Sequence, residues 1–374
     1  MTQSLQAHLS IIRDPRQAGK VIHRLSDIVI LSICATVSGA EGWLDIEEFG
    51  RTHEKWLQSH GMFGNGIPVD DTIARVMSML NPKAFQTAFI AWMRDVTTLT
   101  QGDVIAVDGK TLRRSHDRKA KRAPLHMVSA FACRNGVVLG QERTAEKSNE
   151  ITAIPELLAL LELKGCIVTI DAMGCQKAIA KQIKARKGDY VLAVKDNQPT
   201  LHEAIVDWFD SAQAHDFKHA QHDYYEQVDK GHGRVEVRRY WVSEDLSGLE
   251  APERWAGLRS IGMAENETHK GDKRTVERRY FISSLAANAC EFAHAVRNHW
   301  GIENRLHWVL DMSFREDECR VRSGDGAEIL SVVRHIALNL LRQDKTSKRG
   351  IKGKRYKAAL DINYAAKVLD PILQ

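Results

Sequence analysis

Four apolar residues followed by an aspartate and a glycine open the stretch that decides the fold, residues 104–111 with the sequence VIAVDGKT. Apolar, β-branched residues bounded by turn formers predict a short buried strand from Val104 to Val107. Asp108 follows this strand directly, and Gly109 lets the backbone turn. A side chain at a strand end leaves the core while a rigid element holds it, so Asp108 is a candidate site residue.

The same pattern recurs downstream, where the apolar strand from Cys166 to Ile170 is followed directly by Asp171. The flanking patterns predict strands and helices in the order β-β-β-α-β-α-β, over residues 104–107, 126–132, 137–140, 151–161, 166–170, 177–187 and 190–194. This order predicts a three-stranded meander continued by parallel βαβ units, and therefore an α/β fold.

The regions around this predicted sheet differ in composition. Residues 1–100 have helical periodicity and predict a helical N-terminal domain. Residues 223–285 are strand-like and rich in arginine and aromatic side chains, which predicts a β-rich insertion. The expected domains are therefore 1–100, 101–222 as the first part of the core, 223–285, 286–341 as the core completion, and 342–374 as a basic C-terminal tail.

A long helix is predicted over residues 288–314, and His299, Glu303 and His307 lie on one face of it at intervals of four residues. If the helix packs on the sheet edge, Glu303 approaches Asp108 and Asp171. Three close carboxylates favour a divalent cation, and oxygen ligands favour Mg²⁺, with Mn²⁺ as the alternative. Two such ions support in-line attack on a phosphodiester.

Other interpretations of these residues stay open. The two histidines with Glu303 permit a zinc site, although the spacing does not match H-E-x-x-H. Carboxylates further along the chain compete with Glu303 for the third position, namely Asp311, Glu316, Asp317 and Glu318. A strand-terminal aspartate is also a common turn former, and a histidine on such a helix is often a hydrogen-bonded core residue.

Composition restricts the class of protein. The chain has 374 residues, of which 43% are hydrophobic and 27% charged, and this excludes a disordered or fibrous protein. The longest apolar run, Ile28 to Ala40, is shorter than the ~20 residues that cross a bilayer, and no export signal is visible at the N-terminus. We therefore expect a cytoplasmic protein without a membrane partner. The six cysteines form no C-x-x-C pair.

The charge distribution permits a nucleic-acid partner. The net charge is +5 and the pI is near 8.8. The excess is concentrated in two clusters, Lys110 to Arg122 and Arg342 to Lys357. Such clusters are either solvated surfaces or phosphate-binding sites, and both interpretations stay open.

Five motifs in this order resemble the DDE-type transposases of bacterial insertion sequences, and the similarity is closest to the H-repeat-associated subgroup. They are Val107-Asp108-Gly109-Lys110-Thr111, Thr169-Ile170-Asp171-Ala172 with Gln176, Lys195-Asp196-Asn197-Gln198, His232-Gly233-Arg234 and His299-Trp300-Gly301-Ile302-Glu303-Asn304. The resemblance covers nearly the whole chain. Together the motifs are specific, whereas each one alone is weak.

The resemblance implies a ribonuclease-H-like catalytic core with an Asp-Asp-Glu triad and two Mg²⁺ ions, interrupted by a β-rich insertion. Asp108, Asp171 and Glu303 occupy the triad positions. Related transposases often have an arginine four residues before the glutamate and a lysine seven after it, where this chain has His299 and Leu310. His299 is then the candidate for the arginine's phosphate contact. The resemblance also implies a homodimer in the DNA complex.

The leading hypothesis is a transposase that binds the inverted repeats at its element's ends, cleaves the DNA and joins the 3′-hydroxyls to target DNA. It would act in DNA transposition and recombination at the bacterial nucleoid, with double-stranded DNA as its partner. Lys110, Arg113 and Arg114 would contact phosphates near the scissile bond. The alternatives are a metal-dependent DNA nuclease without transposition and a catalytically silent DNA-binding repressor.

Overall fold

One mixed sheet of nine strands spans the described part of the chain. The structure is a computed structural model that describes residues 4–116, 123–144, 150–231 and 233–373. The strand order is β3-β2-β1-β4-β5-β9-β8-β7-β6. The strands are β1 (Val104–Leu112), β2 (Leu125–Ala132), β3 (Val137–Thr144), β4 (Ile167–Ile170), β5 (Asp189–Val194), β6 (Asp223–Gly231), β7 (Arg234–Ser243), β8 (Ser260–Lys270) and β9 (Lys273–Ser283). The mixed α/β class predicted from the sequence is confirmed.

The first five strands have the order and directions that the apolar runs predict. β1, β2 and β3 form an antiparallel meander, and β4 and β5 run parallel to β1. The two connections between the parallel strands contain the helices α7 (Glu150–Leu160) and α8 (Lys177–Ala185). Because the parallel strands are covered by helices, their residues are almost all buried, which is why they appear in the sequence as continuous apolar runs.

Strand β1 is longer than the sequence predicts, since it runs to Leu112 and does not end at Val107. Its pairing with β4 stops at Val107, whose partner is Ile170, whereas its pairing with β2 continues to Leu112. The second half of β1 is only partly buried because it has lost its parallel neighbour. The apolar pattern therefore ends before the strand does, and Asp108 lies within β1 at the point where β1 separates from β4.

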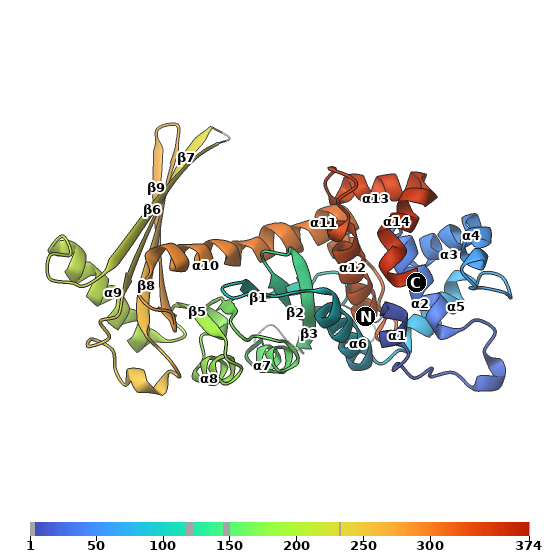
Figure 1. Cartoon of the computed structure of the whole chain (residues 1–374), viewed down its shortest axis with the longest axis horizontal. Coiled ribbons are helices and arrows are strands. Elements are labelled where there is room, and N and C mark those ends of the chain that lie inside the picture. The colour runs from blue at the N-terminus through green and yellow to red at the C-terminus, as the bar shows by residue number, and fades with distance from the viewer. Residues whose placement is uncertain (1–3, 117–122, 145–149, 232, 374) are drawn as a thin grey trace.

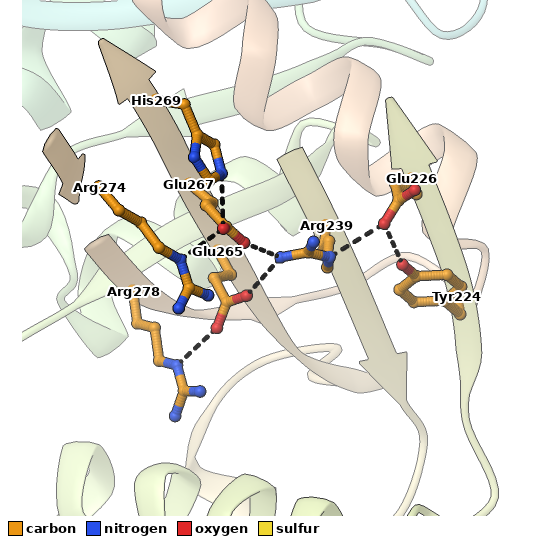
Figure 2. A network of polar contacts seen from close by, with 8 residues as sticks. All are labelled: Tyr224, Glu226, Arg239, Glu265, Glu267, His269, Arg274 and Arg278. Carbon is orange, nitrogen blue, oxygen red and sulfur yellow. Dashed lines mark hydrogen bonds and ion pairs between the residues drawn. The ribbon is translucent and has the colours of Figure 1, made fainter. Parts of the chain in front are cut away.

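Strands β6 to β9 form antiparallel hairpins that extend the sheet beyond β5, and Figure 1 shows them projecting from one end of the elongated molecule. A charged network stabilises one face of this extension (Figure 2). Arg239 donates hydrogen bonds to Glu226, Glu265 and Glu267 at 2.7–3.0 Å, and Arg274 and Arg278 bind the last two. Residues 223–285 thus contain long strands held together by cross-strand ion pairs.

Helices gather at the other end of the molecule (Figure 1). Those before β1 are α1 (Leu5–Leu9), α2 (Leu25–Val37), α3 (Trp43–Thr52), α4 (Glu54–Ser59), α5 (Asp70–Ser78) and α6 (Pro82–Val96). The C-terminal ones are α12 (Gly326–Gln343), α13 (Ile351–Leu360) and α14 (Ile362–Leu373). α12 is buried on nearly all sides and packs against α2, α5, α6, α13, α14 and β3. The N-terminal helices therefore share one core with the segment expected as a basic tail.

A broken helix crosses the sheet between these two ends. It consists of α10 (Ala289–Ile302), a π-helical turn over Glu303–His307, and α11 (Trp308–Phe314), and it is followed by the short 3₁₀ turn Glu316–Glu318. α10 packs on β1, β4 and β5. The single long helix predicted over 288–314 is thus interrupted at Glu303, and a π turn of this kind is frequent at functional sites. None of the described helices is long and apolar enough to cross a lipid bilayer.

Candidate active site

Asp108 and Asp171 occupy equivalent places on neighbouring parallel strands. Val107 of β1 pairs with Ile170 of β4, so the two aspartates are the next residues on strands spaced by about 4.8 Å. The N–H group of Gly109 donates to Asp108 Oδ1 at 2.9 Å, and the N–H group of Met173 donates to Asp171 Oδ1 at 3.1 Å. The strand register thus places both aspartates at the C-terminal end of β4, and both side chains are partly buried there.

The π turn brings Glu303 and His307 onto Asp108. His307 Nδ1 lies 3.5 Å from Glu303 Oε2 and 3.7 Å from Asp108 Oδ2. One ligand atom from each of these three residues falls within 4.8 Å of the other two. Among the described residues, Asp171 is not a member of this group. The sequence predicts that three acids converge, whereas the closest group contains two of these acids and a histidine.

Burial and mutual repulsion separate the pKa values of the two close acids. Burial raises the pKa of Asp108 to about 8, and the neighbouring charges of Glu303 and Asp171 act in the same direction. The hydrogen bond from His307 lowers the pKa of Glu303 to about 2. The two pKa values move in opposite directions in part because burial differs: the Asp108 side chain is 15% exposed, whereas that of Glu303 is 55% exposed. Burial and the nearby carboxylates therefore favour the protonated form of Asp108 over that of Glu303.

Asp171 faces a further buried acid. Burial raises the pKa of Asp171, and the charge of Glu150 raises it further. Glu150 is buried at the start of α7, where its Oε1 lies 2.5 Å from His126 Nε2. A methyl group at Gly109 would lie too close to the ends of both the Glu150 and His126 side chains, so any other residue there would displace this pair. Sequence reasoning missed Glu150, because an acid in the first turn of a helix is ordinarily exposed.

The residues present fit a divalent cation. Two carboxylates share one small volume, and one of them is protonated in the absence of a counter-charge. A cation at this place would offset both the burial and the neighbouring negative charges that raise the pKa of Asp108. Carboxylate oxygens suit Mg²⁺ and Mn²⁺, and an imidazole nitrogen is better accepted by Mn²⁺ than by Mg²⁺.

His299 of α10 lies against strand β4. Its Nδ1 is 3.1 Å from Thr169 Oγ1, and burial lowers its pKa to about 4, so the ring is neutral at pH 7. It borders a hollow of about 120 Å³ that is lined by residues of β4, β5, β9 and α10 and by the residues that directly follow β4 and β5, among them Asp171, Lys195, Arg279 and Trp300. A neutral imidazole can hydrogen-bond a phosphate but cannot form the ion pair that an arginine would.

The three predicted basic contacts differ in accessibility. Arg113 and Arg114 are exposed, and Arg113 Nε lies 3.1 Å from Asp317 Oδ2. Lys110 is 12% exposed and binds Asp311 and Glu316, so its ammonium group is held inside the protein. Residues 117–122 of the first basic cluster lie outside the described residues.

The competing acids have other partners in the structure. Asp311 and Glu316 bind Lys110, and Glu318 binds Arg315 on the surface. Of the two histidines that the sequence offered with Glu303, His307 lies in the cluster with Asp108 and Glu303, whereas His299 is not a member of it among the described residues. The spacing of four residues had already placed His307 on the same helix face as Glu303.

Comparison with known proteins gives a family. The model described as "Transposase DDE domain" matches residues 99–340, and that described as "DDE_Tnp_1-associated" matches residues 6–93. The chain is 48% identical to the "H repeat-associated putative transposase YhhI" of Escherichia coli (strain K12), over 98% of both chains. It is also 48% identical to the "Putative transposase YncI" of Escherichia coli O157:H7, over 98% of this chain and 94% of the relative.

A shorter relative carries a different description. The "Inactive transposase YbfQ" of Escherichia coli (strain K12) is 62% identical over 76 residues, which cover 20% of this chain and 90% of that protein.

Proposed function

This chain belongs to the DDE transposase family and is similar over nearly its full length to an H-repeat-associated putative transposase, and we propose that it is an active transposase. It binds the inverted repeats at the ends of its element, cleaves the DNA there and transfers the 3′-hydroxyl ends to target DNA. The meeting of Asp108 with Glu303, beside Asp171 on the adjoining strand, is the observation that carries this proposal.

Asp108, Asp171 and Glu303 form the proposed catalytic triad and would hold two Mg²⁺ ions, for which Mn²⁺ can substitute. When bound, such ions lower the pKa of a bound water or 3′-hydroxyl and stabilise the leaving oxygen. The chain's own residues place the site where β1 separates from β4, and His307 orients the Glu303 carboxylate. This assignment accounts for the shifted pKa values of the three carboxyl groups.

Strands β1 to β5 in the order 3-2-1-4-5, with an antiparallel meander and two parallel strands, support a ribonuclease-H-like core. In this proposal, residues 101–222 and 286–341 form the core and residues 223–285 are its insertion. Residues 1–100 form a helical N-terminal domain whose core includes helices of the basic C-terminal segment, residues 342–374.

Double-stranded DNA is the proposed partner, at both the element ends and the target, and we expect the protein to act as a homodimer at the nucleoid. Arg113 and Arg114 are the proposed phosphate contacts, since both are exposed on the chain segment that follows the catalytic strand. His299 would contact the same backbone through a hydrogen bond. Lys110 is not retained in this role because it is buried and ion-paired.

The test is Mg²⁺- or Mn²⁺-dependent cleavage and joining of duplex oligonucleotides that carry the element's ends. Asp108→Asn and Glu303→Gln should each reduce the rate by ~10²-fold or more, as loss of a group that stabilises developing charge does. Glu291→Gln, in the first turn of the same helix, is the matched control and should stay within about twofold of the wild type.

Different outcomes separate the candidate functions. Cleavage without joining would assign a metal-dependent nuclease, and DNA binding without turnover in either metal would assign a silent repressor. Unchanged activity in both Asp108→Asn and Glu303→Gln would refute the site.

A further inference from the structure

Strand β1 presents two charged side chains to the broken helix. Asp108 and Lys110 are two residues apart, so both point to the same face of the strand, whereas Gly109 faces Glu150 and His126. On the helix, Glu303, His307 and Asp311 recur at intervals of four residues and share a face. Asp108 faces Glu303 and His307, and Lys110 faces Asp311 one turn further along. The strand and the helix are therefore in contact through charged groups at two successive levels along the strand: Asp108 with Glu303 and His307 forms the first level, and Lys110 with Asp311 forms the second.

The second level is more deeply buried than the first. The Lys110 ammonium donates to Asp311, and it donates to Glu316 Oε2 at 2.9 Å. The side chains of Lys110 and Glu316 are 12% and 1% exposed. Glu316 Oε1 in turn accepts from Ser331 at 3.4 Å and lies 3.8 Å from Arg334, both on α12. Lys110 thus connects the catalytic strand, the catalytic helix, the 3₁₀ turn that follows this helix, and the central helix of the fold.

The spacing of the two levels is the same on both elements. Two residues of a strand span about 6.7 Å, and four residues of an α-helix span about 6 Å. Asp108 and Lys110 on β1 therefore match His307 and Asp311 on the helix. A shift of the helix by one residue would rotate Asp311 by about 100° away from Lys110 and would move Glu303 away from Asp108 by the same rotation.

We propose that Lys110 is a positioning residue for the metal site. By binding Asp311 and Glu316 it fixes the register of the catalytic helix on β1, and this register brings Glu303 and His307 to Asp108. Lys110 does not contact DNA in this assignment. The inference rests on the proposed function only for the role of the three acids as metal ligands.

The chain offers a matched control, because a second buried lysine supports the fold through partners other than the acids of the site. The side chain of Lys354 on α13 is 8% exposed. Its ammonium donates to the carbonyl oxygens of Leu341 and Asp344 at 2.8 and 2.6 Å and pairs with the Asp344 carboxylate at 3.4 Å. Replacing either lysine removes a buried, fully paired charge, so both replacements destabilise the fold.

The experiment measures Mn²⁺ binding to the full-length protein without DNA, by titration calorimetry or by the electron paramagnetic resonance of free Mn²⁺. Each variant is measured at a temperature where circular dichroism shows that it is folded. Lys110→Met should raise the dissociation constant for Mn²⁺ by ~10-fold or more, the effect typical of a partner that orients metal ligands. Lys354→Met should leave it within about twofold. Lys110→Arg, which restores the charge, should recover part of the affinity.

Should Lys110→Met not fold, Asp311→Asn carries the test, since it removes the partner's charge at equal size and should weaken Mn²⁺ binding by ~3- to 10-fold. Wild-type affinity in the folded Lys110→Met or Asp311→Asn variant, together with lost affinity in Asp108→Asn, would overturn the positioning role and leave the proposed function standing. Equal weakening by Lys354→Met would also overturn it. The expected binding pattern without any DNA cleavage would refute the proposed function and leave the positioning role intact.

Discussion

Replacement of Glu316 by glutamine should destabilise the protein by roughly 3 kcal/mol at pH 7. The carboxylate is 1% exposed and binds Lys110, with Arg334 close by. Burial alone would raise the pKa of Glu316, but these positive charges outweigh it and lower the pKa from 4.5 to about 2. At ~1.4 kcal/mol per pKa unit this corresponds to roughly 3 kcal/mol. Removal of one partner from a buried ion pair typically costs ~3–5 kcal/mol, in agreement.

The pH dependence of this difference follows from the direction of the shift. Because the pKa of Glu316 is lower in the folded protein, the stabilisation of the fold by the Glu316 carboxylate is complete above about pH 4.5. It is lost as the pH falls toward 2. Glu316→Gln has no such group to protonate. The difference in unfolding free energy between wild type and variant should therefore shrink to roughly 2 kcal/mol at pH 3.5.

Urea unfolding followed by tryptophan fluorescence, at pH 7 and pH 3.5, measures both quantities. The control is Glu318→Gln in the same 3₁₀ turn, where the glutamate is exposed and paired with Arg315, and its effect should stay below about 1 kcal/mol. If Glu316→Gln costs less than about 1 kcal/mol at pH 7, or if its cost grows as the pH falls, the reasoning about this buried charge is wrong.

Three further changes test other parts of the account. Gly109→Ala places a methyl group against the buried Glu150 and should lower the free energy of unfolding by ~1–3 kcal/mol in urea titrations; an unchanged midpoint would contradict the close approach of Glu150 to Gly109. Arg113→Ala with Arg114→Ala should reduce the slope of log K against log salt for duplex DNA by ~1–2, and an unchanged slope would exclude them as phosphate contacts. Arg239→Met leaves three carboxylates of the insertion without their shared cation and should cost ~2–4 kcal/mol in thermal unfolding, whereas a higher melting temperature would refute the stabilising role of the network.

The succession of strands and helices from β1 to β5 could be predicted from the sequence because each buried strand carries an apolar run bounded by turn formers. The same reasoning placed the end of β1 too early. Val107 is the last residue of β1 with a neighbour on both sides, and beyond it only β2 continues. Apolar residues mark where a strand is covered on both faces and not where its hydrogen bonding ends. This distinction cannot be made without knowing how long the neighbouring strand is.

The candidate site could be predicted in part. The aspartates follow two apolar runs, and Glu303 and His307 are spaced as neighbours on one helix face, so the approach of Glu303 to Asp108 could be predicted. The burial and ion pairing of Lys110 could not be predicted. Within a run of basic residues it looks like a surface cation, and its partners Asp311 and Glu316 lie about two hundred positions away in the chain. Nothing local in the sequence distinguishes a buried ion pair from an exposed one.

The central claim is that Asp108, Asp171 and Glu303 share divalent metal at the edge where β1 and β4 separate. Anomalous diffraction from crystals of the protein with its end DNA and Mn²⁺ tests this most directly. We predict Mn²⁺ peaks bound by Asp108 and Glu303, with Asp171 joining them as a ligand and the scissile phosphate next to the metal. Peaks at other residues, with these three carboxylates bound to no metal in a complex that holds the DNA, would contradict the account.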